Sequence, residues 1–544
     1  MKHRHFFFLS LILFSFFSIL FHTNIPVIWP DEVLFFNPSW ELSHNGIMRT
    51  SVLDGLIPGM DTHTLWMPPL YMISLSLIFK IFPSELITAR LFSSFISLGS
   101  IYIVYRICLR YQFSSKRIAG VLFLLATDFL FLKFSHTARM ESLCLFFALG
   151  AFYFLVRGSG VGRDNRRDLG KDLINQVPTK ATTTLTTKDI FLSGICLSLS
   201  FLSHPFGIVH SIPVLFLLFQ RNQLNFKNIM LYSLAGIIPI LIWGIYVFPN
   251  WDLFIVQFGA QLSRKNELLG KFTWIDKVKI IFSVYKFPMI KLGLFVLTLM
   301  IVAYYSVFKY FKKERIINSW YLKISASTES FFLVWIFTLL LFLLLSSESW
   351  YVFHIVVPFT LLLSSIIETQ NKFVKQFFIF SILYNLVVIF WVPFSLYFVY
   401  KSPEKTEEFF HLIEKEIEQK NNIYLQIFPD PYFYFRKKFP DKNFHEFIPG
   451  ELSAIQKKNP DEPEKIDLLN RLGITKENYK IDANFYKETI QKQEVFLFYN
   501  ESLMNEYIRD YLQKNESQFD KKVIQVNTPK GSDLKLEAIL YSKK

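Results

Sequence analysis

Residues 2–33 read KHRHFFFLSLILFSFFSILFHTNIPVIWPDEV, and this stretch decides the fold. Four basic residues precede an apolar run at 6–21, and no small-x-small cleavage site follows the run. We therefore expect a retained first membrane span with its N-terminus inside the cell. The far end of the span delivers Asp31 and Glu32 to the outer membrane surface, since each acid would cost about 2.5 to 3.5 kcal/mol at the bilayer centre.

The composition is that of a polytopic membrane protein. The 544-residue chain is 52% hydrophobic, contains 62 Phe and has a mean hydropathy of +0.31, which is too apolar for a soluble multidomain protein. The net charge of +14 comes from basic residues gathered in short loops, as the positive-inside rule predicts, so nucleic acid is not an expected partner. The three cysteines lie in or at the ends of apolar runs, which argues against disulfides and Cys-ligated zinc: Cys108, Cys144 and Cys196.

The basic loops divide residues 1–400 into roughly eleven spans of an inner (plasma) membrane, with the N-terminus cytoplasmic. Residues 67–82 are short and begin with two prolines, and a crossing there would place the basic residues of 106–117 outside. We expect these residues to form an interfacial or re-entrant helix of a first external loop, residues 29–88. The expected spans are 6–21, 90–109, 118–134, 143–156, 190–202, 206–219, 229–248, 288–308, 331–345, 352–367 and 377–399.

Residues 401–544 have a mixed polar composition that predicts a small soluble α/β domain on the extracytoplasmic (periplasmic) side. No catalytic motif stands out in it. The expected helices are 404–419 and 502–513, and the expected strands are 422–428, 494–499, 522–526 and 534–541.

Polar clusters that are not rich in Lys or Arg interrupt the apolar pattern on one membrane face only. Because basic residues alone set the topology, this agreement is independent evidence for one extracytoplasmic site built from several loops. The clusters are Asp31-Glu32, 136–141, 204–205 and 348–354.

In their order and spacing, several motifs of residues 6–400 resemble those of the GT-C polytopic glycosyltransferases, in the branch of protein O-mannosyltransferases and lipid A aminoarabinose transferases. Weaker matches are His204-Pro205-Phe206-Gly207 and Trp350-Tyr351 before Pro358. The main matches are Pro30-Asp31-Glu32, Asn45-Gly46, Pro68-Pro69-Leu70-Tyr71, Ala89-Arg90-Leu91-Phe92-Ser93 and Ala138-Arg139-Met140-Glu141-Ser142.

Enzymes of this family take a sugar from a polyprenyl-phosphate carrier and invert the anomeric centre in one displacement. The resemblance implies that Asp31 is the general base that deprotonates an acceptor hydroxyl, with Glu32 orienting substrate. Glu141 stands where the family often has a second active-site acid, usually Asp. Arg90 would hold the donor phosphate by charge-assisted hydrogen bonds. The other implied substrate-binding residues are Arg139, His204, Trp350 and Tyr351.

The charged residues of these motifs also have structural interpretations. Asp31 and Glu32 are favourable first-turn acids of a helix, worth about 0.3 to 1 kcal/mol. Arg90 and Arg139 are suited to anchoring helix ends at the membrane surface. Arg139 and Glu141 lie two positions apart, so on a helix they would point in different directions and need not pair.

The aromatic and histidine motifs have structural interpretations as well. His204 breaks a helix in a short turn, and Trp350 and Tyr351 fit an aromatic belt at the membrane interface. A divalent metal is possible if His63, Asp61 or Glu141 converged with His204. No spacing resembles a ligand set, so no cofactor is assigned.

Three classes of function are open at this stage. A glycosyltransferase explains the clustered motifs, and a lipid-linked donor needs no Gly-rich nucleotide loop; its acceptor is a protein, lipid or glycan. A secondary transporter or flippase of a lipid-linked sugar would need acids or broken helices near the bilayer midplane and two repeated halves. The spans are almost free of acids and show no repeat. A membrane scaffold that displays the C-terminal domain leaves the motifs unexplained.

Overall fold

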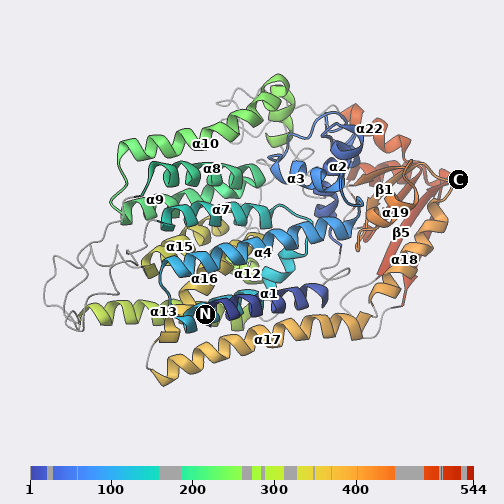
Figure 1. The fold of residues 1–544 in the computed structure, drawn as a ribbon. Helices are drawn as coiled ribbons and strands as arrows, with labels where there is room; N and C mark the ends of the chain where they lie inside the picture. Colours follow the sequence, from blue (N-terminus) through green and yellow to red (C-terminus); the bar gives the residue numbers. More distant parts are fainter. Residues whose placement is uncertain are drawn as a thin grey trace, which may run out of the picture.

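The computed structural model of the chain describes residues 2–20, 28–57, 59–157, 185–259, 273–283, 288–311, 328–346, 349–368, 371–400, 402–446, 483–501, 504, 506–527 and 536–544. Most helices run side by side in one bundle, and a small sheet lies at one end of it (Figure 1). The bundle helices are α1 (Lys2–Leu20), α4 (Leu86–Arg110), α5 (Ser115–Ala126), α6 (Phe129–Ser135), α7 (Glu141–Arg157), α8 (Thr187–Ser203), α9 (Ser211–Gln220), α10 (Phe226–Val247), α12 (Trp274–Ser283), α13 (Pro288–Phe311), α15 (Thr328–Ser346), α16 (Phe353–Ser364) and α17 (Lys372–Tyr400).

The bundle confirms a helical polytopic membrane protein. Within the described ranges, five helices are long and apolar enough to cross a membrane, and a sixth is counted if α5 and α6 form one bent span. Other apolar helices, such as α7 and α9, are shorter than the roughly 20 residues that a straight crossing requires. The expected count of roughly eleven spans is therefore not confirmed.

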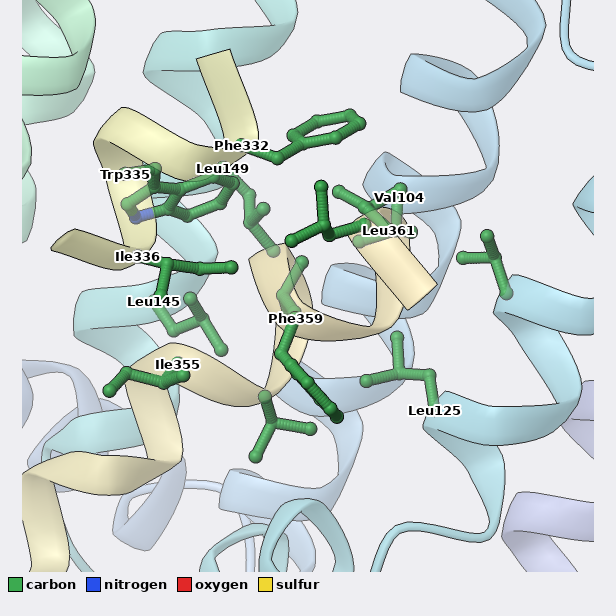
Figure 2. Packing of buried hydrophobic residues seen from close by; sticks show 14 of the residues in the cluster. Val104, Leu125, Leu145, Leu149, Phe332, Trp335, Ile336, Ile355, Phe359 and Leu361 are labelled. Carbon is green, nitrogen blue, oxygen red and sulfur yellow. The ribbon is translucent and has the colours of Figure 1, made fainter. Parts of the chain in front are cut away.

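The bundle core is filled by large apolar side chains that meet from several helices. Figure 2 shows Leu125 of α5, Leu145 of α7, Trp335 of α15 and Phe359 of α16 pointing into one space. Trp335 is 1% exposed although tryptophan is rarely buried completely. Phe359 is thus a packing residue of the protein interior.

The expected span 118–134 is broken near its middle, a break that its hydropathy does not predict. Helix α5 ends at Ala126, and α6 is bent by 56° relative to it. Asp128 caps α6, because its Oδ1 accepts hydrogen bonds from the backbone N–H of Leu130 and Phe131 at 3.0 and 3.1 Å. Its Oδ2 accepts a bond from Nζ of Lys291 at 3.1 Å, and both charged side chains are buried. The spans therefore do contain a buried acid.

Replacing Lys291 with methionine would leave the Asp128 carboxylate buried without its cation. An uncompensated buried charge costs about 3 to 5 kcal/mol, so we expect Lys291→Met to lower the thermal unfolding temperature of the purified protein in detergent. The double variant Asp128→Asn/Lys291→Met removes both charges and should recover part of the loss. A single variant as stable as the wild type would show that this pair contributes nothing to stability.

The C-terminal part confirms the predicted α/β domain. Its five strands lie in the order β2-β1-β3-β5-β4, with β1 parallel to β2 and β3, and β5 antiparallel to β3 and β4. Strand β2 and helices α19 and α22 were not predicted. Strand β2 and helix α19 are short and lack a clear apolar period. The elements are α18 (Ser402–Ile417), β1 (Asn422–Gln426), α19 (Tyr432–Lys438), β2 (Asn443–Glu446), α22 (Ala483–Lys492), β3 (Val495–Phe498), α23 (Glu506–Lys514), β4 (Phe519–Val526) and β5 (Leu536–Lys543).

Helices α2 (Pro30–Asn45) and α3 (Leu70–Phe79) lie between the bundle and the sheet (Figure 1). With ten residues, α3 is about 15 Å long and cannot cross a bilayer by itself. The buried face of α2 shares a hydrophobic core with the C-terminal domain. The rings of Phe36 and Phe433 meet edge to face at 4.8 Å, and Asn37 Nδ2 donates to the hydroxyl of Tyr432 at 3.0 Å. The segment that contains α2 and α3 thus packs against both parts of the protein.

Candidate active site

Local sequence determines where α2 begins and ends. Trp29 is extended at the N-cap, and Pro30 occupies the first helical position, where its missing N–H is not needed. The Glu32 carboxylate accepts a hydrogen bond from the backbone N–H of Trp29 at 3.2 Å. At the other end, Gly46 has φ +72°, a left-handed conformation that glycine adopts without strain. The motif residues therefore sit on a helix whose start is firmly defined.

A buried ion pair between Glu32 and Arg90 anchors this start. Arg90 of α4 donates from Nε to Glu32 Oε1 at 2.9 Å and from Nη2 to Oε2 at 2.7 Å. The side chains of both residues are no more than 1% exposed. Oε1 of Glu32 also accepts the backbone N–H of Ala138 at 2.8 Å. One carboxylate thus joins α2, α4 and the turn before α7.

Arg139 in that turn holds two acids together. Its Nη1 donates to Oδ2 of Asp31, and its Nε and Nη2 donate to Oε1 of Glu141 at 3.0 and 2.6 Å. The expectation that Arg139 and Glu141 need not pair is wrong. That argument assumed a helix, whereas Arg139 lies in the turn and α7 begins only at Glu141.

Aromatic rings surround the Arg139 guanidinium. Its Cζ lies 5.6 Å from the ring centroid of Trp29, 5.9 Å from that of Phe35 and 5.7 Å from that of Trp350. Burial lowers the pKa of Arg139, but the charges of Glu141 and Asp31 outweigh burial and raise that pKa above its ordinary value. The guanidinium is therefore a permanent cation at the centre of the cluster.

Asp31 is the carboxylate of this cluster that remains accessible. Its side chain is 24% exposed, compared with 1% for Glu141 and 0% for Glu32. Arg139 binds Oδ2, while Oδ1 has no hydrogen-bond partner among the described residues. Such a carboxylate is oriented through one oxygen and can accept a proton on the other.

Lys133 brings a second cation to the cluster. This residue lies in the last turn of α6, and its Nζ is 5.8 Å from the ring centroid of Trp29. Within the described residues it forms no ion pair with a carboxylate. The sequence signal for this residue is a lysine inside the expected span 118–134.

His204 and Tyr351 lie next to each other. The His204 ring is 4.9 Å from that of Tyr351, and its Nδ1 accepts the backbone N–H of Phe206 at 2.9 Å. Both side chains are buried. The structure thus brings two predicted residues together in a packed aromatic contact. Glu348, at the start of the same polar cluster, lies outside the described residues.

A hydrogen-bonded pair of histidines continues from this contact into the bundle. Trp335 Nε1 donates to His210 Nδ1 at 3.1 Å, so His210 carries its proton on Nε2. That nitrogen then donates to Nδ1 of His354 at 3.3 Å. Each of these rings is at most 1% exposed, so this pair joins helices rather than facing a substrate.

The C-terminal domain adds two buried carboxyl groups, Asp430 and Glu446, near the start of α2. The backbone N–H of Asp430 donates to the carbonyl of Ile28 at 3.4 Å. Burial, together with the negative charge of Glu32, raises the pKa of Asp430 to about 7. Burial and the charges of Asp430 and Asp31 raise the pKa of Glu446, which is hydrogen bonded to Asp430. Nothing in the sequence signalled this pair.

A metal centre is not evident in the part of the chain that the structure describes. No group of three or more His, Cys, Asp or Glu side chains there is arranged to hold a metal ion. His63 instead lies beside Tyr246, with ring centroids 5.7 Å apart, and its backbone carbonyl accepts a bond from Gln257. The convergence of His63 and Asp61 with Glu141 and His204 is therefore not found.

The architecture is similar to that of known membrane proteins, although no family model and no curated protein matches the sequence. ArnT from Cupriavidus metallidurans, in a crystal structure bound to undecaprenyl phosphate, aligns with 99% of this chain and 97% of its own, with a TM-score of 0.59 and 11% identity. The oligosaccharyltransferase from Archaeoglobus fulgidus aligns with 91% of this chain and 69% of its own, with a TM-score of 0.48 and 12% identity. The similarity to ArnT confirms the predicted GT-C-like fold.

The raised pKa of Asp430 predicts a pH-dependent stability. The ordinary pKa of an aspartate is 3.8, and that of Asp430 in the folded protein is about 7. At pH values between these two, the folded protein retains a proton on Asp430 that the unfolded chain has lost. The contribution of this group is therefore complete below about pH 4 and is lost as the pH rises through about 7. We expect Asp430→Asn to flatten the fall in thermal unfolding temperature between pH 5 and pH 8.

His445 acts in the opposite sense, because burial lowers its pKa to about 4 and its contribution is lost as the pH falls. The measurement is therefore the difference between wild type and Asp430→Asn at each pH, in which His445 cancels and which reports the coupled Asp430–Glu446 pair. An identical pH profile for both proteins would contradict the assignment of a protonated Asp430.

Proposed function

We propose that the chain is a membrane glycosyltransferase that moves a single sugar from a polyprenyl-phosphate donor to an acceptor hydroxyl, with inversion, on the extracytoplasmic side. The observation that carries the proposal is Asp31. It is an accessible carboxylate between membrane helices and the C-terminal domain, oriented by Arg139. The GT-C-like fold supports the reaction class, and the lipid phosphate named for ArnT is the chemistry expected of the donor.

In the proposed reaction, Oδ1 of Asp31 accepts the proton of the acceptor hydroxyl. The hydroxyl oxygen forms a bond to the anomeric carbon, and the bond from that carbon to the phosphate oxygen breaks. The electron pair leaves with polyprenyl phosphate. Arg139 holds Asp31 through the other oxygen, so the carboxylate is already aimed before substrate binds.

The leaving phosphate needs a cation. Arg90 was the residue expected to hold it, but two of its guanidinium nitrogens bind the Glu32 carboxylate, so we assign Arg90 and Glu32 the positioning of α2. Lys133 is better suited to bind the phosphate. Its ammonium group lies over Trp29 beside Arg139, and it has no carboxylate partner among the described residues. We propose Lys133 as the phosphate-binding residue. Glu141 stays a prediction as the second active-site acid. His204, Trp350 and Tyr351 stay predictions for substrate binding.

One observation favours the alternative of a transporter or flippase of lipid-linked sugar. The helix break at Asp128, with Lys291 as partner, is the kind of feature that such proteins place near the bilayer midplane. The ion pair is closed and caps a helix, however, so it has a sufficient structural explanation. The experiment on Asp31 separates the two functions.

Asp31→Asn keeps the size of the side chain and a hydrogen-bond acceptor for Arg139 but removes the base. We expect transfer to fall by about 10² to 10⁴-fold. Cells that express wild type, no protein, Asp31→Asn or the exposed control Asp61→Asn, at equal membrane abundance, are compared by mass spectrometry of envelope lipids, glycans and glycoproteins.

One glycan should disappear in the null and Asp31→Asn cells while a polyprenyl-phosphate sugar accumulates, and Asp61→Asn should match wild type. The missing glycan then identifies the acceptor. If Asp31→Asn behaves like wild type while the null differs, Asp31 is not the base and transport becomes the better proposal.

Lys133→Met should lower the transfer rate with little effect on folding, because the methionine fills similar space without the charge. Lys133→Arg keeps a cation and should retain part of the rate. In a membrane assay with saturating acceptor, the ratio of the two variants is the measurement. Equal losses in Met and Arg variants would assign Lys133 to packing against Trp29.

A further inference from the structure

A concave site lies beside α2, on the stripe of this helix next to the one that carries Asp31. It is a cavity of about 540 Å³ between α2, the segment 83–85 that leads into α4, and α19 of the C-terminal domain. This volume falls in the usual range of small-ligand sites, about 300 to 1,000 Å³. The lining residues that matter here are Phe36, Trp40, Ile87, Arg90, Arg436 and Lys437.

The helical period separates the two sites. Glu32, Phe36 and Trp40 are four residues apart and lie along one stripe of α2. That stripe faces the cavity and Arg90. Asp31 and Phe35 lie on the neighbouring stripe, which faces Arg139. The cavity is therefore distinct from the cluster that the proposed reaction uses.

The cavity carries an uncompensated positive charge. Glu32 neutralises Arg90, and Glu85 pairs with Lys437 at 2.9 Å. Arg436 differs, because its hydrogen bonds go only to neutral groups.

Arg436 Nη1 donates to the carbonyl oxygens of Pro440 and Lys442 at 2.8 and 3.2 Å, and Nε donates to the Tyr432 hydroxyl at 3.3 Å. The guanidinium carbon lies 5.4 Å from the ring centroid of Trp40. Within the described residues no carboxylate pairs with Arg436, and Nη2 has no acceptor there. The geometry suits an anion such as phosphate.

The start of a candidate membrane span forms one side of the cavity. Leu86 and Ile87 line it and form the first turn of α4, a candidate span. Along the same helix, Leu91 and Phe95 follow Ile87 at four-residue intervals and are 54% and 75% exposed. This stripe of α4 is thus open to lipid directly below the cavity.

We propose that this cavity binds the headgroup phosphate of an anionic phospholipid from the surrounding membrane, with an acyl chain along Leu91 and Phe95. The phosphate accepts hydrogen bonds from Arg436, and Trp40 covers the headgroup. A bound lipid would connect the C-terminal domain to the first turn of α4. This proposal does not depend on the transfer reaction, since it concerns a different face of α2.

The test uses the purified full-length protein, delipidated in detergent, with native mass spectrometry to measure lipid binding. The probes are phosphatidylglycerol, phosphatidylcholine, polyprenyl phosphate and inorganic phosphate. Arg436→Gln removes the charge, and Lys438→Gln is the matched control, because Lys438 lies on the same helix but pairs with Glu414 outside the cavity.

We expect phosphatidylglycerol to bind wild type and Lys438→Gln alike, and to bind Arg436→Gln about tenfold more weakly, as the loss of a charge-assisted hydrogen bond predicts. Phosphatidylcholine should bind more weakly than phosphatidylglycerol, and millimolar inorganic phosphate should compete only partly. Equal binding to wild type and Arg436→Gln, or equal binding of the two phospholipids, would overturn the proposal. So would an Arg436-dependent site that takes only polyprenyl phosphate or only inorganic phosphate.

A measurement on the unmutated protein covers the case in which Arg436→Gln does not fold. A photoreactive phosphatidylglycerol with its reactive group near the phosphate should cross-link to residues 433–440 or 83–87, as peptide mapping will show. Cross-links confined to other segments would refute the assignment.

Discussion

The candidate site depends on one buried ion pair, Glu32 with Arg90. Removing two charges from water is expensive, and the pair is stable only because each partner is extensively hydrogen bonded. Glu32 accepts hydrogen bonds from Arg90 and from the backbone N–H groups of Ala138 and Trp29. These bonds fix the position of its carboxylate. The neighbouring residue Asp31 is thereby placed against Arg139. Because Glu32 is buried and held in place, the accessible Asp31 beside it also has a defined position.

Helix α2 separates two chemically different surfaces. One stripe presents Asp31 to a buried guanidinium and to aromatic rings, and the next stripe forms a wall of a cavity that contains Arg436. The C-terminal domain contributes to both surroundings, through Asp430 near the start of α2 and through α19 beside its middle. Since α2 and the sheet share one hydrophobic core, the C-terminal domain packs directly against the helix that carries Asp31.

Two groups of polar side chains in the bundle interior are held by partners from neighbouring elements. Asp128 caps a broken helix and pairs with Lys291, and His210 bridges Trp335 and His354. Unpaired polar groups at these depths would cost more than their partners contribute. Such contacts join elements of the bundle that lie far apart in the chain.

The sequence by itself determined the features that depend on local physics. Apolar runs predicted the helices, period-two segments predicted most of the strands, and Pro30 with Gly46 marked the bounds of α2. The position of Asp31 and Glu32 at the end of a span followed from the cost of burying charge. The tertiary structure alone decided which charges meet. Glu32 and Arg90 lie 58 residues apart, and Asp31 and Arg139 lie 108 apart.

The carboxyl pair of the C-terminal domain and the cavity beside α19 left no trace in the sequence pattern. A charged residue has the same hydropathy whatever its partner. Which charged residues pair, and which are buried, is therefore decided only when helices far apart in the chain pack together. For the same reason the break at Asp128 escaped the hydropathy pattern: the backbone bonds and the Lys291 cation that satisfy this acid come from the fold.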